Sequence, residues 1–377
     1  MTEGRARPLP GGFAGYYFDA IGLDGRHVLV ACWYSGFLFS PRYYDEVLEL
    51  RDRKGVQPEE GIVLADPSNH GAFSLALYDQ GRTVAYLVAE EPLARGESDP
   101  WFPALHAGEP GLSGAMPPPG AKMGIGDNRV TRTADGAYEL EFADRSKWFR
   151  ASFEGKVRFR PLGGASAVVP LAPSGGPPSE AEQHWQILCS RAEVTGKIRW
   201  NDPISRKQNS LDLQALGYVD RNAGRLPISP RVGRWLWGRF QGSGKMLAYY
   251  RLDPAEPEPA DAKSGPRPGP LSFLYTSDRE REGLMPGAQI VPHRVHRNRW
   301  GMPHPLEIEG TGGDLAFRAH TVRIVDRGPF YVRTLSRLSC ADPSLDGLLG
   351  ITECFLPSRW DVPLYRLMAR GRIRRGP

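Results

Sequence analysis

The feature that most constrains the fold of this sequence is a long succession of short strand-like segments, each closed by a turn signal. The segments are rich in β-branched and aromatic residues and are bounded by Gly, Asp or Pro. They include residues 27–40, 72–79, 83–91, 137–143, 156–162, 246–252, 271–277, 314–326 and 330–338. Helical periodicity is fair only over residues 40–53, which predicts one short helix. The whole pattern predicts an all-β fold of antiparallel strands arranged as barrels or sandwiches.

The length of 377 residues predicts two domains, because one small core does not grow to this size. The 44 glycines and 35 prolines fit many strands joined by turns. The sequence has neither an apolar signal core near its start nor a run of roughly 18 apolar residues. We therefore expect a cytoplasmic protein without a membrane span. The four cysteines have no C-x-x-C spacing, and we expect reduced, buried thiols.

Several common chemistries have no candidate residues in this sequence. GIGDNR at 124–129 lacks the third glycine and the helix of a nucleotide-binding loop. No G-x-S-x-G elbow offers a nucleophilic serine, and no H-E-x-x-H or C-x-x-C pair offers a metal site. His293, His296 and His304 have no carboxylate near them in the sequence, so we expect a surface or loop role for them and predict no metal. An enzyme with this sequence would work by acid–base chemistry and by the shape of its pocket.

One stretch, GYVDRNAGRLPISPRVGRWLWGRF at 217–240, concentrates an acid, an amide, two tryptophans and several arginines. Tyr218 and Asp220 are two positions apart in a strand pattern, so their side chains share a face. In an ordinary hairpin, Asp220 and Asn222 would stabilise the turn. In an apolar cavity, Asp220 would instead act as a catalytic acid. The residues of this stretch alone leave both interpretations open.

Segments along nearly the whole chain, taken in order, resemble the bacterial carotenoid 1,2-hydratases, which are also called hydroxyneurosporene synthases. The likeness begins with GGFAGYYFDA and an FSPRY turn, and GYVDRNAG with RWLWGR resembles the signature of the family. The similar segments are residues 11–44, 66–91, 185–194, 217–224, 234–239, 328–335 and 351–375. The same superfamily contains the tocopherol cyclases, and fungal decalin-forming cyclases are related to it in fold.

The resemblance implies two lipocalin-like antiparallel β-barrel or sandwich domains packed together, which we place at residues 1–228 and 229–377. It also implies an activity: addition of water to a terminal isoprene double bond, without a cofactor. The partner that it implies is an apolar isoprenoid small molecule, such as an acyclic carotenoid.

Hydration of an unactivated alkene begins with protonation to a tertiary carbocation, which requires a strong acid in a pocket that excludes water. Burial can keep a carboxylic acid protonated near neutral pH. We predict that Asp220 is this general acid and that Tyr218 hydrogen-bonds its carboxyl group or relays its proton. His184 would orient the acid or activate the water. Neighbouring strand residues point to opposite faces, however, so His184 and Trp185 share a cavity only across a bulge.

The predicted substrate contacts are mostly aromatic. The faces of Trp185, Trp235 and Trp237 could each stabilise a cation by about 1–2 kcal/mol in a dry site. Core packing is the alternative role for Trp235 and Trp237. The remaining predicted contacts are Asn222, Tyr17 and Trp33.

Four other residues have two open roles each. Asn69 and His70 either contribute to the site or belong to a capped loop. Arg333 and Glu353 form a structural ion pair between strands or take part in catalysis, and we favour the ion pair.

The sequence departs from the family pattern close to this presumed site. EQHW at 182–185 puts Glu182 and His184 where a histidine and a tryptophan are usual. Ala223 follows Asn222 where many relatives have a bulky or acidic residue, and TEC at 352–354 keeps only Glu353 of a His-Glu-Ser segment. The resemblance is therefore firmer for the superfamily than for the reaction.

Three functions stay open: a hydratase, a terpenoid or polyene cyclase that uses the same acid, and a non-catalytic carrier of an apolar ligand. A carrier predicts a solvated Asp220. The basic run RGRIRR at 370–375 predicts a tail that contacts anionic lipid or keeps the protein soluble rather than a nucleic-acid arm. We expect peripheral contact with the inner membrane and no nucleic-acid partner. The oligomeric state cannot be derived from the sequence.

Overall fold

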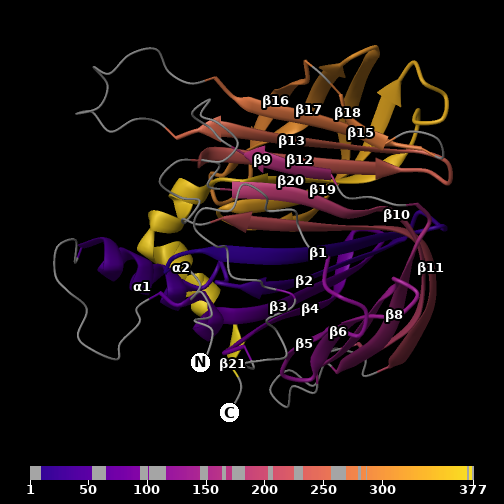
Figure 1. The fold of residues 1–377 in the computed structure, drawn as a ribbon. Coiled ribbons are helices and arrows are strands. Elements are labelled where there is room, and N and C mark those ends of the chain that lie inside the picture. The colour runs from indigo at the N-terminus through magenta and orange to yellow at the C-terminus, as the bar shows by residue number, and fades with distance from the viewer. Residues whose placement is uncertain are drawn as a thin grey trace, which may run out of the picture.

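The computed structural model consists mainly of two curled sheets stacked on each other (Figure 1). It describes residues 10–52, 65–93, 101, 116–144, 152–163, 167–171, 183–202, 207–224, 232–255, 269–278, 282–285, 287–371 and 373–375. The predicted all-β fold is confirmed, with two antiparallel sheets that form a barrel and a half-barrel.

The first sheet joins strands from the first 224 residues with one strand from near the C-terminus. Its order is β21-β4-β3-β2-β1-β11-β10-β8-β7-β6-β5, with β9 paired to β10. The bounds are β1 (Phe13–Gly22), β2 (His27–Ser35), β3 (Gly71–Asp79), β4 (Arg82–Glu91), β5 (Lys122–Ile125), β6 (Asn128–Arg132), β7 (Tyr138–Asp144), β8 (Phe153–Pro161), β9 (Ala167–Leu171), β10 (Gln183–Asn201), β11 (Gln208–Gly224) and β21 (Arg374–Arg375). Strand β5 also contacts β3 and β4, so the sheet curls back on itself.

The second sheet has the order β15-β14-β13-β12-β20-β19-β18-β17-β16. The bounds are β12 (Val232–Gln241), β13 (Met246–Pro254), β14 (Leu271–Ser277), β15 (Glu282–Met285), β16 (Gln289–Arg297), β17 (Pro303–Gly312), β18 (Leu315–Arg327), β19 (Tyr331–Cys340) and β20 (Leu349–Phe355). The domain boundary predicted at 228/229 lies outside the described residues and stays a prediction. Strand β21 returns to the first sheet and pairs in parallel with β4.

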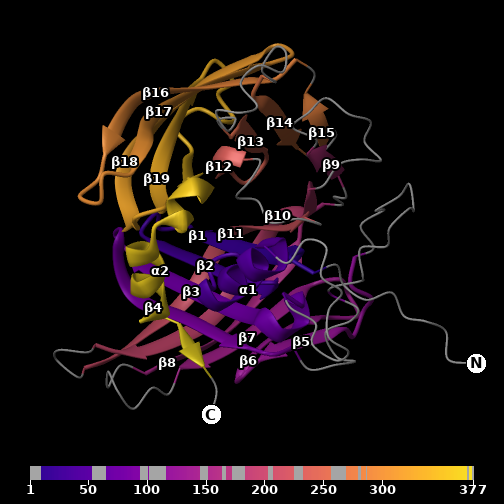
Figure 2. The ribbon, with the colours of Figure 1, turned by 90° about the vertical axis from the view of Figure 1, so that its left-hand side faces the viewer.

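Short helices lie at the edges of the sheets. Helix α1 (Pro41–Asp52) agrees with the predicted helix at 40–53, and α2 (Pro363–Arg370) contacts it. The 3-10 turns are η1 (Pro67–His70) and η3 (Pro357–Asp361). Helix α2 lies where the two sheets meet (Figure 2). Of the helices in the described residues, none combines the length and the apolar character needed to cross a bilayer.

Strand alternation divides the buried side chains into three layers. One fills the inside of the first sheet, one fills the inside of the second sheet, and the third lies between them. On β2, for example, Cys32 belongs to the middle layer and Trp33 to the inside of the first sheet. The middle layer includes Trp185, Tyr218 and Trp237.

The histidine-rich segment 292–305, for which a surface or loop role was predicted, forms parts of β16 and β17, and His296 pairs with His304 in register. His296 is exposed at the surface, as predicted. His304 is buried, and the side chain of His293 lies 3.2 Å from the carboxylate of Glu309. The contact of His293 with Glu309 could not be seen in the sequence pattern, because antiparallel pairing joins residues that are separated along the chain. Among the described residues, no group of three His, Cys, Asp or Glu side chains could hold a metal ion.

The cysteines mostly follow expectation. Cys32, Cys189 and Cys354 are buried free thiols, whereas Cys340 is only half-buried.

Candidate active site

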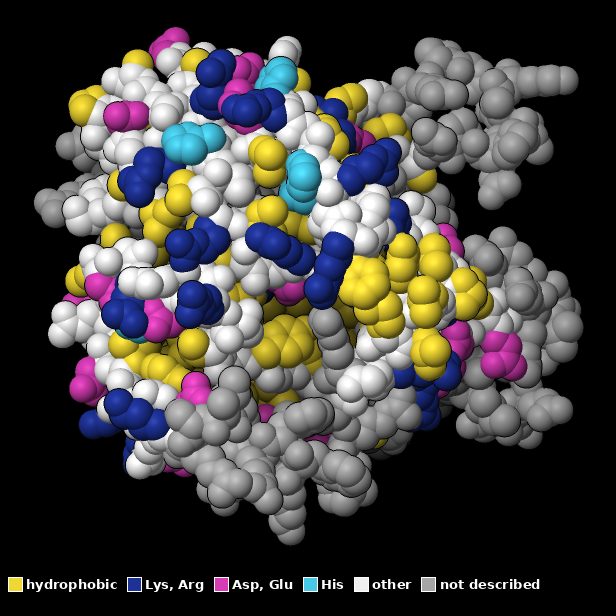
Figure 3. All heavy atoms as spheres, turned by 180° about the vertical axis from the view of Figure 1, so that it is seen from behind, with side chains coloured by type: hydrophobic (Ala, Val, Ile, Leu, Met, Phe, Trp, Pro, Cys, Tyr) yellow, Lys and Arg dark blue, Asp and Glu magenta, His cyan; other side chains and the backbone are white. Residues whose placement is uncertain are grey.

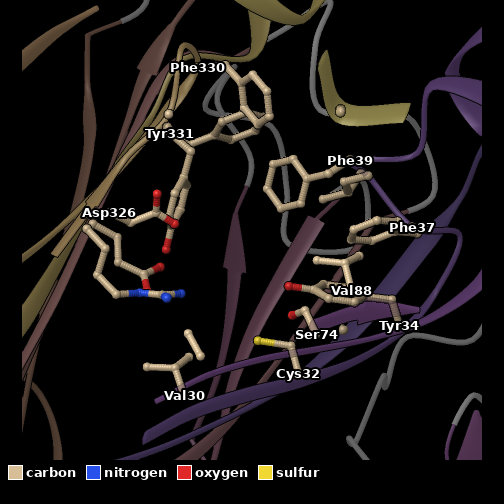
Figure 4. Close-up of a pocket in the computed structure, with 18 of the residues that line it drawn as sticks. Val30, Cys32, Tyr34, Phe37, Phe39, Ser74, Val88, Asp326, Phe330 and Tyr331 are labelled. Carbon is tan, nitrogen blue, oxygen red and sulfur yellow. The ribbon is translucent and has the colours of Figure 1, made fainter. Parts of the chain in front are cut away.

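A pocket of about 190 Å³ opens between the two sheets and is lined mainly by aromatic and aliphatic side chains. Figure 4 shows Phe330 and Tyr331 on one side of it, facing Tyr34 and Phe39 on the other. The pocket thus lies between the two sheets and not inside either of them. The insides of both sheets are filled by the two outer core layers.

Asp220 lies in the middle layer next to this pocket and is 1% exposed. Its carboxyl oxygen Oδ2 accepts hydrogen bonds from Trp185 Nε1 at 2.9 Å and from Tyr218 Oη at 3.0 Å. Oδ1 accepts one from Asn222 Nδ2 at 3.3 Å. These described donors are all neutral groups. Asn222 lines the pocket, so it separates the acid from the cavity by a single side chain.

Burial raises the pKa of Asp220 to about 8. Removal from water penalises the charged carboxylate, and the negative charges of Glu353 and Asp19 act in the same direction. The hydrogen bonds from Trp185 and Tyr218 lower the pKa but do not outweigh the burial. At neutral pH, Asp220 therefore holds its proton.

Strand pairing explains how these residues meet. Tyr218, Asp220 and Asn222 alternate along β11 and point to one face, as the sequence predicted. Trp185 on β10 lies opposite Asn222, and Tyr17 on β1 lies opposite Asp220. Tyr17 also lines the pocket. Residues from three neighbouring strands thus surround one carboxyl group.

The structure does not bring His184 to this cluster. His184 is half-buried, lies opposite Ala223, and directly precedes Trp185 in an unbroken part of β10. Strand alternation therefore points its side chain to the other face of the sheet. Glu182, the other departure from the family pattern at this strand, lies outside the described residues.

The three predicted tryptophans of the site gather in the middle layer. Trp185 stacks on Tyr250 with ring centroids 5.0 Å apart, and Trp235 lies 5.2 Å from the same ring. Trp237 packs edge-on against Tyr17 at 5.1 Å. Trp235 lines the pocket, whereas Trp237 and Trp185 are buried behind it.

Trp33 corrects another prediction. Its indole is fully buried inside the first sheet, against Phe18 and Phe73, and takes no part in the pocket between the sheets. The reason is alternation: the preceding residue, Cys32, faces the pocket, so Trp33 faces away.

Sequence reasoning missed Tyr250 and Gln183. Tyr250 Oη donates to Asn222 Oδ1 at 3.1 Å, and Gln183 Nε2 donates to Tyr250 Oη at 3.1 Å. This chain of hydrogen bonds fixes the side-chain amide that lies between Asp220 and the pocket. The tyrosine pair in MLAYYRL was visible in the sequence, but only the sheet packing shows that Tyr250, and not Tyr249, faces the site.

A second polar cluster lines the pocket from the other sheet. Arg333 Nε donates to Glu353 Oε1 at 2.8 Å, which confirms the predicted ion pair between strands. Tyr17 Oη donates to the same oxygen at 3.1 Å, and Arg333 Nη1 donates to Tyr78 Oη at 3.0 Å. Glu353 thus connects the two sheets at the pocket wall.

Asn69 and His70 lie in the capped turn that was the alternative to a site role. The Asp66 side chain caps η1 by accepting from the Ser68 amide at 2.9 Å, and Asn69 is exposed. His70 is buried between the carboxylates of Glu46 and Glu90, at 2.9 and 3.1 Å from its two ring nitrogens. This arrangement ties α1 to the first sheet.

Comparison with known proteins agrees with the likeness seen in the sequence, although no family model matches. The chain is 26% identical over 379 residues to a protein named hydroxyneurosporene dehydrogenase from Chlorobaculum tepidum, which covers 97% of this chain and 87% of the relative. It is 25% identical to the acyclic carotenoid 1,2-hydratase of Thiocapsa roseopersicina, over 98% of this chain and 74% of that protein. This chain is a homologue of the carotenoid 1,2-hydratases.

Solved structures support the fold of this hydratase homologue. A Nitrosomonas europaea protein described as a candidate AttH superposes with a TM-score of 0.56 at 11% identity, over 91% of this chain and 92% of that one. CghA solved with Sch210972 gives 0.53 at 12% identity, over 93% and 89%. Kievitone hydratase from Nectria haematococca gives 0.51 at 11% identity, over 95% and 93%. The prediction of an enzyme of the hydro-lyase class agrees with the two curated relatives that are named acyclic carotenoid 1,2-hydratases.

Proposed function

We propose that this carotenoid hydratase homologue adds water to a terminal double bond of an acyclic carotenoid or a related isoprenoid, with Asp220 as the general acid. The observation that carries the proposal is the state of Asp220. It is buried beside an apolar pocket, receives hydrogen bonds from neutral donors, and has a pKa raised to about 8. An acid that stays protonated at neutral pH in a dry site can protonate an alkene.

The hydrogen bonds assign the two carboxyl oxygens different tasks. Trp185 and Tyr218 both donate to Oδ2, so the acidic proton belongs on Oδ1, which lies on the side of Asn222 and the pocket. Transfer of this proton to the less substituted alkene carbon leaves a tertiary cation. The conjugate carboxylate then keeps the hydrogen bonds of Trp185 and Tyr218, which stabilise its charge. Water adds to the cation, and the loss of one proton from the added water gives a tertiary alcohol. These steps need no cofactor.

The size of the pocket favours reaction at the end of a long molecule. Its volume of about 190 Å³ is below the roughly 300–1,000 Å³ of pockets that enclose a drug-sized ligand. One end of an acyclic carotenoid fits inside, while the remainder has to extend through the mouth. Trp235 and the other aromatic residues that line the pocket can stabilise a cation formed at that end, each contributing about 0.5–2 kcal/mol.

A carrier fits this site less well than an enzyme. A non-catalytic binder predicts a solvated Asp220, whereas the side chain is 1% exposed. A cyclase remains the second candidate, because an internal alkene or hydroxyl group could capture the same cation in place of water. The hydratase is favoured by the names of two of the relatives.

Peripheral membrane contact is part of this proposal, since an apolar substrate resides in lipid. The apolar residues Leu364 and Leu367 on α2 are 58% and 65% exposed, and Tyr365 and Met368 of the same helix line the pocket. Figure 3 shows a cluster of exposed hydrophobic side chains beside a hollow in the surface. Residues 356–377 contain six arginines and one aspartate, which favours an anionic surface.

Vesicle binding tests this membrane contact. Replacing Leu364 and Leu367 by serine should reduce sedimentation with anionic vesicles severalfold, and deleting residues 370–377 should weaken it further at low salt. Exposed Val322 on β18 gives a matched control, since its change to serine should have no effect. Equal sedimentation of all variants would contradict the proposed contact.

Incubation in heavy water with an acyclic carotenoid, followed by mass spectrometry, tests the reaction. The proposed function predicts a product with one non-exchangeable deuterium and one hydroxyl group. Asp220→Asn, which is nearly isosteric, should abolish this product while substrate still binds. Deuterium without added oxygen would indicate a cyclase or an isomerase. An unchanged substrate that still binds, or an apolar ligand extracted intact from the purified protein, would favour a carrier.

A further inference from the structure

The proposed reaction needs a base as well as an acid, and the pocket has a carboxylate that the mechanism above does not use. Glu353 on β20 lines the pocket from the second sheet, and its side chain is 17% exposed. Asp220, in contrast, is 1% exposed behind Asn222 on the first sheet. Glu353 therefore reaches the cavity surface from the second sheet, while Asp220 lies one side chain behind that surface on the first sheet.

We propose that Glu353 binds the water molecule that captures the cation and accepts its proton. This inference rests on the proposed function and assigns the second half of the same reaction. Arg333 holds Glu353 in an ion pair, with Nε 2.8 Å from Oε1, and so fixes the position of the carboxyl group at the pocket wall. The two acids differ in their partners: Asp220 receives hydrogen bonds from neutral donors only, whereas Glu353 is paired with a guanidinium.

The carboxylate has room for a water molecule. A carboxylate offers about four acceptor positions. The described donors to Glu353 are Arg333 Nε, Tyr17 Oη and the Tyr331 side chain. Because all three of these residues line the pocket, the group is held firmly at the cavity surface. The remaining acceptor position suits one pocket water.

Strand register places the two carboxyl groups at the same end of the pocket. Tyr17 lies directly opposite Asp220 across β1 and β11, and its hydroxyl donates to Glu353. Trp237 lies opposite Glu353 across β12 and β20 and packs against both Tyr17 and Tyr218. An alkene bound here would meet the acid from one sheet and the water from the other.

The step balances without a co-reactant. Asp220 gives its proton to one alkene carbon, and the other carbon becomes a cation. The water oxygen forms the new C–O bond while one of its O–H bonds breaks, and that proton passes to Glu353. Exchange with solvent then returns a proton to Asp220 and removes one from Glu353.

The experiment separates proton transfer from water capture. The wild type, Glu353→Gln and Asp220→Asn are incubated with an acyclic carotenoid in heavy water, and deuterium and oxygen are measured in both the product and the recovered substrate. In Glu353→Gln the cation still forms but returns to alkene by losing a proton. We therefore expect deuterium in the recovered alkene and a loss of hydration of about 10²–10⁴-fold. Asp220→Asn should show neither deuterium nor hydration. Exposed Glu309, changed to Gln, is the surface control.

Two results would overturn the inference. One is hydration by Glu353→Gln within about threefold of the wild type, and the other is a parallel loss of deuterium uptake and hydration. A wild type that incorporates neither isotope nor oxygen would instead contradict the proposed function itself. If Glu353→Gln does not fold, the double variant Arg333→Gln with Glu353→Gln removes both charges of the ion pair and should give the same separation of deuterium uptake from hydration.

Discussion

Asp19 and Asp220 are two buried acids on neighbouring strands of one sheet, and their partners differ. Asp19 is 0% and Asp220 is 1% exposed, and both face the layer between the sheets. Asp19 receives two hydrogen bonds from the guanidinium of Arg239, including one from Nε at 3.1 Å. Asp220 receives its hydrogen bonds from an indole, a phenol and an amide.

This difference decides their protonation. Burial raises the pKa of both acids, but Arg239 opposes it at Asp19, whose pKa is about 6, while Asp220 reaches about 8. At pH 7, Asp19 is ionised and joins the sheets as half of an ion pair, and Asp220 is a neutral acid. Equal burial thus gives a structural group in one place and a proton donor in the other, because the charge of the partner differs.

The largest expected effect is on stability. Asp19→Asn leaves the fully buried Arg239 without its counter-charge, which should lower the free energy of unfolding by about 3–5 kcal/mol. Asp220→Asn should not lower the free energy of unfolding at pH 7 and should raise it, because the wild-type carboxyl has to take up a proton on folding at this pH and the amide does not. Urea unfolding of both variants at pH 7 measures the contrast. Equal losses would mean that the two acids are in the same charge state.

The pH dependence of the free energy of unfolding should report the protonation of Asp220. Its pKa is raised from 3.8 to about 8 on folding, so the folded state binds the extra proton. The stability that this proton contributes is complete below pH 4 and is lost as the pH rises to 8. The wild type should therefore lose stability relative to Asp220→Asn over this range, at up to about 1.4 kcal/mol per pH unit.

Activity should have an alkaline limit that is set by the same carboxyl group. kcat/KM should fall about tenfold per pH unit above pH 8, as Asp220 loses its proton. A flat profile from pH 7 to 10 would exclude Asp220 as the acid.

Removing a donor from Asp220 should move this limit upward. The Trp185 Nε1 hydrogen bond lowers the pKa of Asp220, so Trp185→Phe should raise that pKa. Tyr218→Phe should act in the same direction. The matched control is Trp235→Phe, because the described donors to Asp220 do not include Trp235. An alkaline limit that stays in place in Trp185→Phe would show that this bond does not tune the acid.

The smallest expected effects distinguish a tryptophan of the core, Trp33, from a tryptophan of the pocket wall, Trp235. Trp33→Phe leaves space in the core of the first sheet and should cost about 1 kcal/mol of stability without changing KM. Trp235→Phe removes part of the pocket wall and should raise KM about threefold with little loss of stability. Thermal unfolding and steady-state kinetics test the pair, and a higher KM for Trp33→Phe would restore its predicted substrate contact.

The sequence determined much of this protein by local rules. Turn signals and β-branched segments predicted the strands, and alternation put Tyr218 and Asp220 on one face, where their side chains do meet. The motifs around Asp220 and the Trp-x-Trp pair identified the relatives before any comparison. The ion pair of Arg333 with Glu353 followed from opposite charges on neighbouring segments.

The tertiary structure alone decided which face of each strand the site uses. Alternation says that Cys32 and Trp33 point to opposite sides, but not that the first lines a pocket and the second a core. Likewise, Tyr17 reaches Glu353 over 336 positions of sequence. A period of two residues specifies which side chains share a face. What covers that face depends on how the two sheets pack, and that is set by the summed contacts of residues far apart in the chain.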